Sequence, residues 1–272
     1  MNNFPALFSP AFIGKMLVKN RIVMAPMLVG YGNIDGTVSN NVIEYYEARA
    51  RGGVGVIIVE AACVDAPEGR ETFTQLNIDH PRYVAGLECL SQSIKVHGCR
   101  SFIQLFHAGR QTFSSITGTQ PVAPSPVACP MIKEMPRSLS REEIKTIEDK
   151  FITAASYAYM AGFDGVEIHA AHGYLINQFL SSHTNQRDDD YGGSLANRMK
   201  ILLNIVKGIK QAAPELAVSV RLNIDDFVSG GLDFIETSKI ALELETAGVN
   251  LINCTCGTYE SGLNSIEPAS YE

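Results

Sequence analysis

The sequence predicts an α/β protein with the architecture of a (β/α)8 TIM barrel. Short apolar runs rich in β-branched residues alternate along the chain with longer amphipathic segments, the order that produces parallel strands joined by right-handed helical crossovers. The runs lack in–out alternation, as expected for strands that are buried on both faces. No G-x-G-x-x-G motif follows any of them, which argues against an open dinucleotide-binding sheet.

The apolar runs are predicted to be the strands of the barrel. An eight-stranded barrel would need two more βα units of about 30 residues each, and the polar tail after Cys254 is too short for them. We therefore expect residues 1–272 to form one barrel domain of about six βα units, with the last two missing. The predicted strands are residues 21–26, 54–60, 100–105, 165–169, 217–222 and 249–254.

The segments between these strands carry helix signals. The sequence Ser-Arg-Glu-Glu at 140–143 is a capping box and is followed by an apolar stripe at helical spacing. Ser194 is placed to cap a second helix. Residues 39–51, 81–97 and 234–247 are further predicted helices, and the Pro-rich stretch 121–136 is predicted to be a long loop over one mouth of the barrel.

Composition and charge exclude several classes of function. The 272 residues carry a net charge of −7 without a basic cluster, so no nucleic-acid or anionic-membrane surface is expected. No apolar run reaches the roughly 20 residues that cross a bilayer, and the N-terminus lacks the pattern of a secretory signal, so we predict a cytoplasmic protein. The six cysteines form no C-x-x-C pair, which favours reduced core thiols over disulfides or a zinc site.

Polar side chains end several of the predicted strands. In a parallel barrel, chemistry takes place at the carboxyl ends of the strands. Gln104, His169 and Arg221 stand at three of these ends, and Glu60 and Asn253 stand at two others. Each residue alone could satisfy a nearby backbone group. Several convergent polar groups at one mouth instead indicate a ligand site.

The densest cluster is the segment 169–174, which reads His-Ala-Ala-His-Gly-Tyr and has three interpretations. His169 and His172 could bind a metal, as in a metal-dependent aldolase, although no H-E-x-x-H arrangement adds a third ligand or a base. The two imidazoles could instead donate hydrogen bonds to a carbonyl or enolate oxygen, with the Tyr174 phenol as proton donor. They could also be structural.

Arg221 and Gln104 together suggest a flat cofactor. A guanidinium in an apolar strand is costly without an anion, and a carboxamide offers both donors and an acceptor to the edge of a heterocycle. A flavin has such an edge and becomes anionic near N1 when it is reduced. The spacing of the two residues alone does not distinguish a flavin from another heterocycle.

Four segments resemble the Old Yellow Enzyme family of FMN-dependent oxidoreductases. The resemblance is to the branch of NADH:flavin oxidoreductases, 2-enoate reductases and 2,4-dienoyl-CoA reductases. It covers nearly the whole chain, which corresponds to the front part of the family's barrel. The segments are KNRIVMAPM (19–27), YYEARARGGVGVIIVE (45–60), QLFHAGR (104–110) and the long, specific stretch 163–198.

The resemblance implies roles for individual residues. His169 and His172 would hold the substrate oxygen, and Tyr174 would protonate the substrate carbon. Gln104 would bind the pyrimidine of FMN, Arg221 would face N1 and O2, and the other contacts would come from the end of the first strand and from one small residue beside the ring edge. The implied FMN-binding residues are Ala25, Pro26, Met27, Ala62, Gln104 and Arg221.

Some features depart from the family pattern. Leu28 stands where relatives often have Thr or Cys near flavin O4, and Tyr259 occupies the region of a proton-delivering His of dienoyl-CoA reductases. The loops that grip the FMN phosphate, and the cysteines that hold a 4Fe–4S centre in longer relatives, would lie beyond residue 272. Weak FMN retention is therefore expected. The segment 185–198, with Arg187, Asp188 and Asp190, is interpreted as a structural brace.

The implied activity is hydride transfer from NADH or NADPH, through FMN, to the activated C=C bond of an α,β-unsaturated carbonyl or enoate compound. Such a small molecule is the expected partner, with no nucleic acid and no membrane, and unpaired sheet edges favour a homo-oligomer. The alternative is a truncated, non-catalytic barrel fragment that acts as an assembly module.

Overall fold

A single curved sheet of parallel strands organises the computed structural model, which describes residues 4–262. Its six strands follow the order β10-β9-β8-β5-β4-β3. Within the described residues the sheet ends at β3 on one side and β10 on the other, so the predicted incomplete barrel is confirmed. The strands are β3 (Val23–Met24), β4 (Val56–Cys63), β5 (Arg100–Phe106), β8 (Gly165–Ala170), β9 (Ala217–Asn223) and β10 (Leu251–Thr255), and each overlaps a predicted strand.

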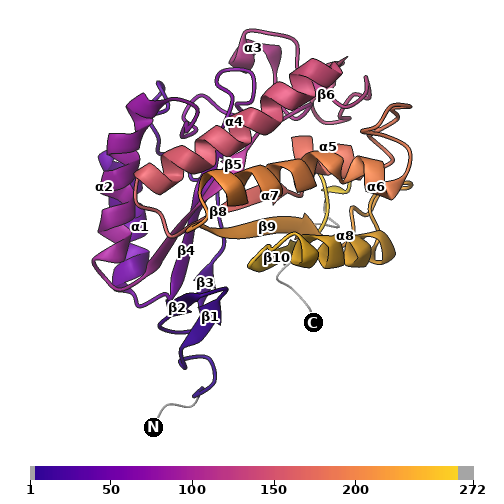
Figure 1. Cartoon of the computed structure of the whole chain (residues 1–272). Coiled ribbons are helices and arrows are strands. Elements are labelled where there is room, and N and C mark those ends of the chain that lie inside the picture. Colours follow the sequence, from indigo (N-terminus) through magenta and orange to yellow (C-terminus); the bar gives the residue numbers. More distant parts are fainter. Residues whose placement is uncertain (1–3, 263–272) are drawn as a thin grey trace, which may run out of the picture.

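Five longer helices connect the strands and lie along the outer side of the sheet (Figure 1). Several of them begin at side chains that cap the free N–H groups of the first turn. Ser140 and Glu143 form the predicted capping box, Ser39 accepts from the Val42 N–H, and Asp233 accepts from the Glu236 N–H. The helices are α1 (Asn40–Arg51), α2 (Val84–Lys95), α4 (Arg141–Met160), α7 (Lys200–Ala212) and α8 (Phe234–Thr246).

Shorter elements complete the described chain. The antiparallel hairpin β1–β2 precedes the barrel and projects beyond one end of the sheet (Figure 1). The Pro-rich loop is bounded by a small parallel pair, β6 with β7. The helix predicted after Ser194 is divided at Met199 into α6 and α7. The remaining bounds are β1 (Ala11–Ile13), β2 (Met16–Val18), η1 (Pro81–Tyr83), α3 (Ser114–Thr117), β6 (Val122–Ala123), β7 (Arg137–Ser138), α5 (Leu175–Leu180) and α6 (Leu195–Arg198).

Apolar side chains fill both sides of the sheet near the start of the strands. On the outer side they form one large core with the helices. On the inner side, Ile58 and Phe102 pack with the hairpin residues Ile13 and Val18. A Cβ atom on Gly165 would lie 2.3 Å from the Phe102 ring, so only glycine leaves room for this ring. The hairpin therefore packs against the inner face of the sheet at the amino ends of its strands.

The inward positions become polar toward the carboxyl ends of the strands. Gln104 lies opposite Glu167 in the register of β5 and β8, and Glu167 lies opposite Ser219 in that of β8 and β9. The fully buried Glu167 carboxylate accepts from Gln104 Nε2 at 2.9 Å, from Ser219 Oγ at 2.9 Å and from Asn253 Nδ2 at 3.1 Å. This hydrogen-bonded layer supports the next inward positions, which carry the candidate site.

The segment 185–198 is a structural brace, as predicted, although Asp189 and not Asp188 is one of its bonded residues. Arg187 Nη1 donates to the carbonyls of Pro124 (2.9 Å) and Leu139 (2.6 Å), which ties the segment to the Pro-rich loop. The Arg187 guanidinium pairs with Asp189 at 2.6 Å, whereas Asp188 is exposed. Asp190 pairs with Lys200.

Two further expectations concern the cysteines and membranes. All six cysteines are free thiols, but only Cys63, Cys99 and Cys129 are buried, so the prediction of core thiols holds for half of them. Among residues 4–262, no helix combines the length and the apolar character needed to cross a membrane.

Candidate active site

A cavity of about 170 Å³ opens at the carboxyl ends of the strands. The last inward-pointing side chains of the strands lie here. In the register of the sheet, His169 on β8 is directly opposite Arg221 on β9. The cavity brings together residues from β4, β5, β8, β9 and the segments that follow β3, β4 and β8. Its lining residues are Pro26, Met27, Leu28, Ala61, Glu71, Gln104, Phe106, His169, His172, Tyr174 and Arg221.

His169 offers a neutral hydrogen-bond donor to this cavity. The side chain is buried, and burial lowers its pKa well below the usual value of 6.5. Its Nδ1 accepts a hydrogen bond from the Ala171 backbone N–H at 3.3 Å, so the proton of the neutral ring must lie on Nε2. The ring also packs edge-on against Tyr174, with the two centroids 4.8 Å apart. His169 is thus an oriented N–H donor that carries no charge.

His172 lies in a turn that buried amides hold in place. Its backbone has a left-handed φ of 58°, which is uncommon for a residue with a side chain. Asn223 Oδ1 accepts from the His172 N–H at 3.2 Å, and Asn177 Oδ1 accepts from the Gly173 N–H at 2.7 Å. Both amides donate to Asp226 Oδ1, at 2.7 Å and 3.2 Å respectively. This buried network fixes the backbone between the two site residues His172 and Tyr174.

Thr255, at the end of β10, orients the His172 ring. The Thr255 hydroxyl lies 2.8 Å from His172 Nε2. Burial and, to a smaller extent, the nearby positive charge of Arg221 lower the pKa of His172 to about 4. The ring is therefore neutral at pH 7, like that of His169.

Tyr174 points its phenol at a carboxyl that the sequence did not indicate. Its Oη donates to Glu71 Oε1 at 2.7 Å and lies 3.1 Å from the Tyr259 hydroxyl, which also donates to Glu71 Oε1. Phe106 covers the Tyr174 ring at a centroid distance of 4.5 Å. Burial and the neighbouring Glu71 raise the pKa of Tyr174 well above 10. Tyr259 thus lies beside the expected proton donor, where the resemblance places it.

Arg221 brings a positive charge to the same cavity. Its Nη1 donates to the Pro26 carbonyl at 3.1 Å, which links β9 to the segment after β3. Its buried Nε has no hydrogen-bond partner among the described residues. Burial lowers the pKa of Arg221, although a guanidinium remains protonated at neutral pH. An unpartnered guanidinium N–H at a cavity is suited to an acceptor or an anion on a ligand.

These features fit the edge and face of a flavin. Gln104 and the Arg221 guanidinium supply the polar contacts, while Pro26, Met27 and Leu28 supply backbone and apolar surface beside them. The residues present thus match the donor set and the apolar lining that a flat, potentially anionic ring requires.

Two of the predicted FMN contacts are not among the lining residues. Ala25 is exposed and does not line the cavity. Ala62 belongs to the outer core, and Ala61 lines the cavity in its place. The reason is a bulge: the register of β4 against β5 shifts between Val59 and Ala61, which reverses the side on which the following residues point.

Glu60, at the bulge, supports the segment after β3. Its Oε2 accepts from the Val29 N–H at 3.1 Å and from the Tyr46 hydroxyl at 3.3 Å. Burial raises the pKa of Glu60 to about 7. Glu60 was one of the polar groups at strand ends that indicated a ligand site. It supports the segment after β3 and does not line the cavity.

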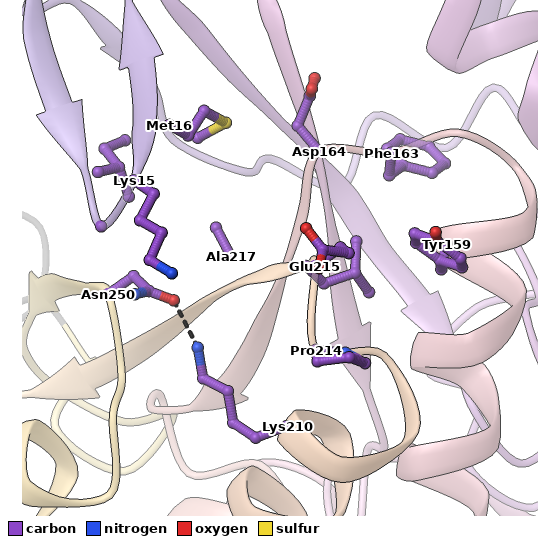
Figure 2. A pocket seen from close by; sticks show the side chains of 13 residues that line it. Lys15, Met16, Tyr159, Phe163, Asp164, Lys210, Pro214, Glu215, Ala217 and Asn250 are labelled. Carbon is purple, nitrogen blue, oxygen red and sulfur yellow. Dashed lines mark hydrogen bonds between the residues drawn. The ribbon is translucent and has the colours of Figure 1, made fainter.

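A second cavity, of about 410 Å³, lies at the opposite end of the barrel (Figure 2). It is bordered by the β1–β2 hairpin, and in Figure 2 Lys210 Nζ donates to Asn250 Oδ1 at 2.7 Å. None of the predicted site residues lines it. The described part of the chain also contains no group of three or more His, Cys, Asp or Glu side chains that could hold a metal, so His169 and His172 have no third ligand there for the aldolase interpretation.

The sequence model of the NADH:flavin oxidoreductase / NADH oxidase family matches residues 6–271. The chain belongs to this family. Membership confirms the predicted family, its TIM-barrel fold and the class of flavin oxidoreductases, whose cofactors are FMN and NAD(P)H.

Similar proteins include shorter and longer members of the family. The NADH oxidase of Thermoanaerobacter brockii is 47% identical over 274 residues, which cover 100% of this chain and 42% of that protein. A 2-naphthoyl-CoA reductase solved with 2-naphthoyl-CoA has a TM-score of 0.91 at 32% identity, with 95% of this chain and 41% of that chain covered. An old yellow enzyme homologue from Zymomonas mobilis has a TM-score of 0.82 at 32% identity, with 93% and 74% covered. The chain thus spans about two fifths of the first two proteins.

Proposed function

We propose that this chain is the FMN-binding barrel of an NAD(P)H-dependent ene-reductase, which reduces the activated C=C bond of an α,β-unsaturated carbonyl or enoate compound. The observation that carries the proposal is the convergence of His169, His172 and Tyr174 with Gln104 and Arg221 on one cavity at the carboxyl ends of the strands. FMN, when bound, would supply the hydride chemistry by accepting hydride from NAD(P)H and delivering it to the β-carbon of the substrate.

Arg221 and Gln104 would hold the cofactor. The Arg221 Nε, which has no partner among the described residues, can donate a hydrogen bond to an oxygen or nitrogen of the ring. The positive charge of the guanidinium favours a negatively charged ring over a neutral one. Gln104 is fixed by its bond to Glu167, so its carboxamide is oriented before a ligand arrives. Preorganised groups of this kind lose little entropy on binding.

His169 and His172 would hold the carbonyl oxygen of the substrate. Both rings are neutral at pH 7, and their centroids are 5.1 Å apart. The His169 Nε2–H is an oriented donor, and the Thr255 hydroxyl can donate to His172 Nε2 and so leave the proton of that ring on Nδ1. Two donors aimed at one oxygen would stabilise the negative charge that develops on it.

Tyr174 would complete the reduction by giving its Oη proton to the α-carbon. The Tyr174 side chain is buried, and its ring packs edge-on against His169 and Phe106. Proton donation by a positioned side chain requires such proximity to the reacting atom. The similar protein that was solved with 2-naphthoyl-CoA, a thioester of an unsaturated acid, supports a conjugated carbonyl as the substrate class. A cytoplasmic location and self-association stay predictions.

The proposal predicts a reduction and a reoxidation that can be followed by absorbance. Anaerobic protein loaded with FMN should be bleached by NADH or NADPH, and addition of 2-cyclohexenone should restore the yellow colour with formation of cyclohexanone. The matched control is cyclohexanone itself, which lacks the double bond and should restore nothing. Failure of bleaching, or recovery that is the same with both ketones, would contradict the proposed function.

A further inference from the structure

A carboxyl that the proposed mechanism does not use lies between two tyrosines at the edge of the site. Glu71 Oε1 accepts hydrogen bonds from both Tyr174 Oη, at 2.7 Å, and Tyr259 Oη. The two phenol oxygens are themselves 3.1 Å apart. Three oxygen atoms that can each carry a proton therefore lie in mutual contact.

This cluster leads from the interior of the site toward solvent. The Tyr174 side chain is only 8% exposed, whereas Glu71 and Tyr259 are both half-buried. The Glu71 backbone N–H donates to Gln75 Oε1 at 2.8 Å, and Gln75 is itself fully buried, so the loop that carries Glu71 is anchored. A proton could thus pass between solvent and the buried phenol along fixed hydrogen bonds.

We propose that Glu71 is a positioning residue that holds the proton with which Tyr174 is recharged after each turnover, with Tyr259 as the second phenol of the relay. The inference rests on the proposed ene-reductase function. Tyr174 loses its Oη proton as the new C–H bond forms at the α-carbon, and the electron pair of that bond comes from the enolate. The Tyr174 phenolate then takes the proton of the Glu71 carboxylic acid, and the Glu71 carboxylate takes a proton from water. One hydride and one proton are thereby added to each double bond.

The surroundings of Glu71 favour its protonated form. Burial raises the pKa of Glu71, and this effect exceeds the lowering caused by the two phenol hydrogen bonds. The ionisable groups that face the relay are His169 and Arg221 near Tyr174, and Cys129 near Tyr259. An ionised Glu71 raises the pKa of Tyr174 further and makes it a weaker acid. Proton delivery should therefore be fast below the pKa of Glu71 and slow above it.

The first test measures the proton on Glu71 without any cofactor. In an infrared pH titration, the difference spectrum of the full chain minus the Glu71→Gln variant should keep the carbonyl stretch of a protonated carboxylic acid to a higher pH than the spectrum of an ordinary Glu would. Glu44→Gln is the matched control, because Glu44 is exposed on α1, and its difference spectrum identifies the bands that come from the new carboxamide. A Glu71 acid band that disappeared at the pH expected of an ordinary Glu would overturn the proposal.

The second test compares two electron acceptors across a range of pH. Reoxidation by 2-cyclohexenone needs a proton on carbon, whereas reoxidation by ferricyanide does not. In the unsubstituted protein the ratio of the enone rate to the ferricyanide rate should fall as pH rises through the pKa of Glu71. In Glu71→Gln this ratio should be about tenfold lower at low pH and independent of pH. Identical profiles for the two proteins would overturn the relay and leave the proposed function intact.

The two proposals can fail separately. A protein that passes electrons to ferricyanide but to no enone would contradict the proposed function, and the infrared band would then decide alone whether Glu71 holds a proton. A Glu71→Gln variant with an unaltered infrared spectrum and an unaltered ratio would contradict the relay alone. Thermal unfolding of each variant checks that the substitution has not disturbed the fold.

Discussion

Replacing Tyr174 by Phe should slow reduction of an enone by roughly a thousandfold, because a positioned general acid contributes about 10²–10⁴-fold to a proton-transfer step. The substitution removes one oxygen atom and leaves the ring that packs on Phe106 and His169. Reduction of FMN by NAD(P)H needs no proton from this phenol and should change far less. Stopped-flow absorbance, recorded separately for bleaching by NADH and for recovery with 2-cyclohexenone, measures the two steps.

A second tyrosine provides the control for this substitution. Tyr157 lies on α4, on the outer side of the sheet, and packs against the outer core. Tyr157→Phe should leave both rates as they are in the unsubstituted protein. Equal losses in bleaching and recovery for Tyr174→Phe would remove Tyr174 from the role of proton donor.

Replacing His169 by Leu should slow enone reduction by about a hundredfold, the typical effect of losing one donor aimed at a developing oxyanion. His169 is suited to this role because the Ala171 N–H fixes its tautomer and burial keeps the ring neutral. The loss should appear in the limiting rate of recovery at saturating enone, since the charge on the oxygen develops during the reaction. The dependence of the recovery rate on 2-cyclohexenone concentration separates this limiting rate from the affinity.

The variant His169→Asn distinguishes the loss of the N–H donor from the loss of the packing of the imidazole ring. Asparagine retains an N–H donor of shorter reach and should recover part of the rate that His169→Leu loses. If both variants were equally slow, or if only the affinity for enone changed, the histidine would be acting by packing rather than by stabilising charge.

The architecture was largely predictable because its signals are local. Strands buried on both faces are short continuous apolar runs, and the capping box at Ser140 marks the start of α4 in the sequence itself. The β1–β2 hairpin and the short helix α5 were not predicted. The hairpin is positioned by the packing of Ile13 and Val18 against Phe102 on the inner side of the sheet, and α5 by packing in the outer core. Such long-range contacts leave no periodic pattern in the sequence.

The residues of the candidate site that stand at strand ends were predictable from the sequence. Those that reach the site from loops were not. Gln104, His169 and Arg221 follow apolar runs and meet because parallel strands end at one mouth. Ala61 could not be distinguished from Ala62, because a strand that is apolar on both faces conceals a bulge. Glu71 lies in a loop, and only the fold brings it to Tyr174, 103 residues away in the sequence.

The most direct test of the central claim is a fluorescence titration of the FMN-free protein with FMN, carried out in parallel on Arg221→Met and Lys210→Met. Arg221 lines the proposed flavin site, and Lys210 lines the cavity at the other end of the barrel (Figure 2). We expect Arg221→Met to weaken FMN binding about tenfold or more, because it removes a charge-assisted hydrogen bond, and Lys210→Met to leave the affinity unchanged. Equal affinities for all three proteins, or a loss confined to Lys210→Met, would show that the flavin does not bind at the carboxyl ends of the strands.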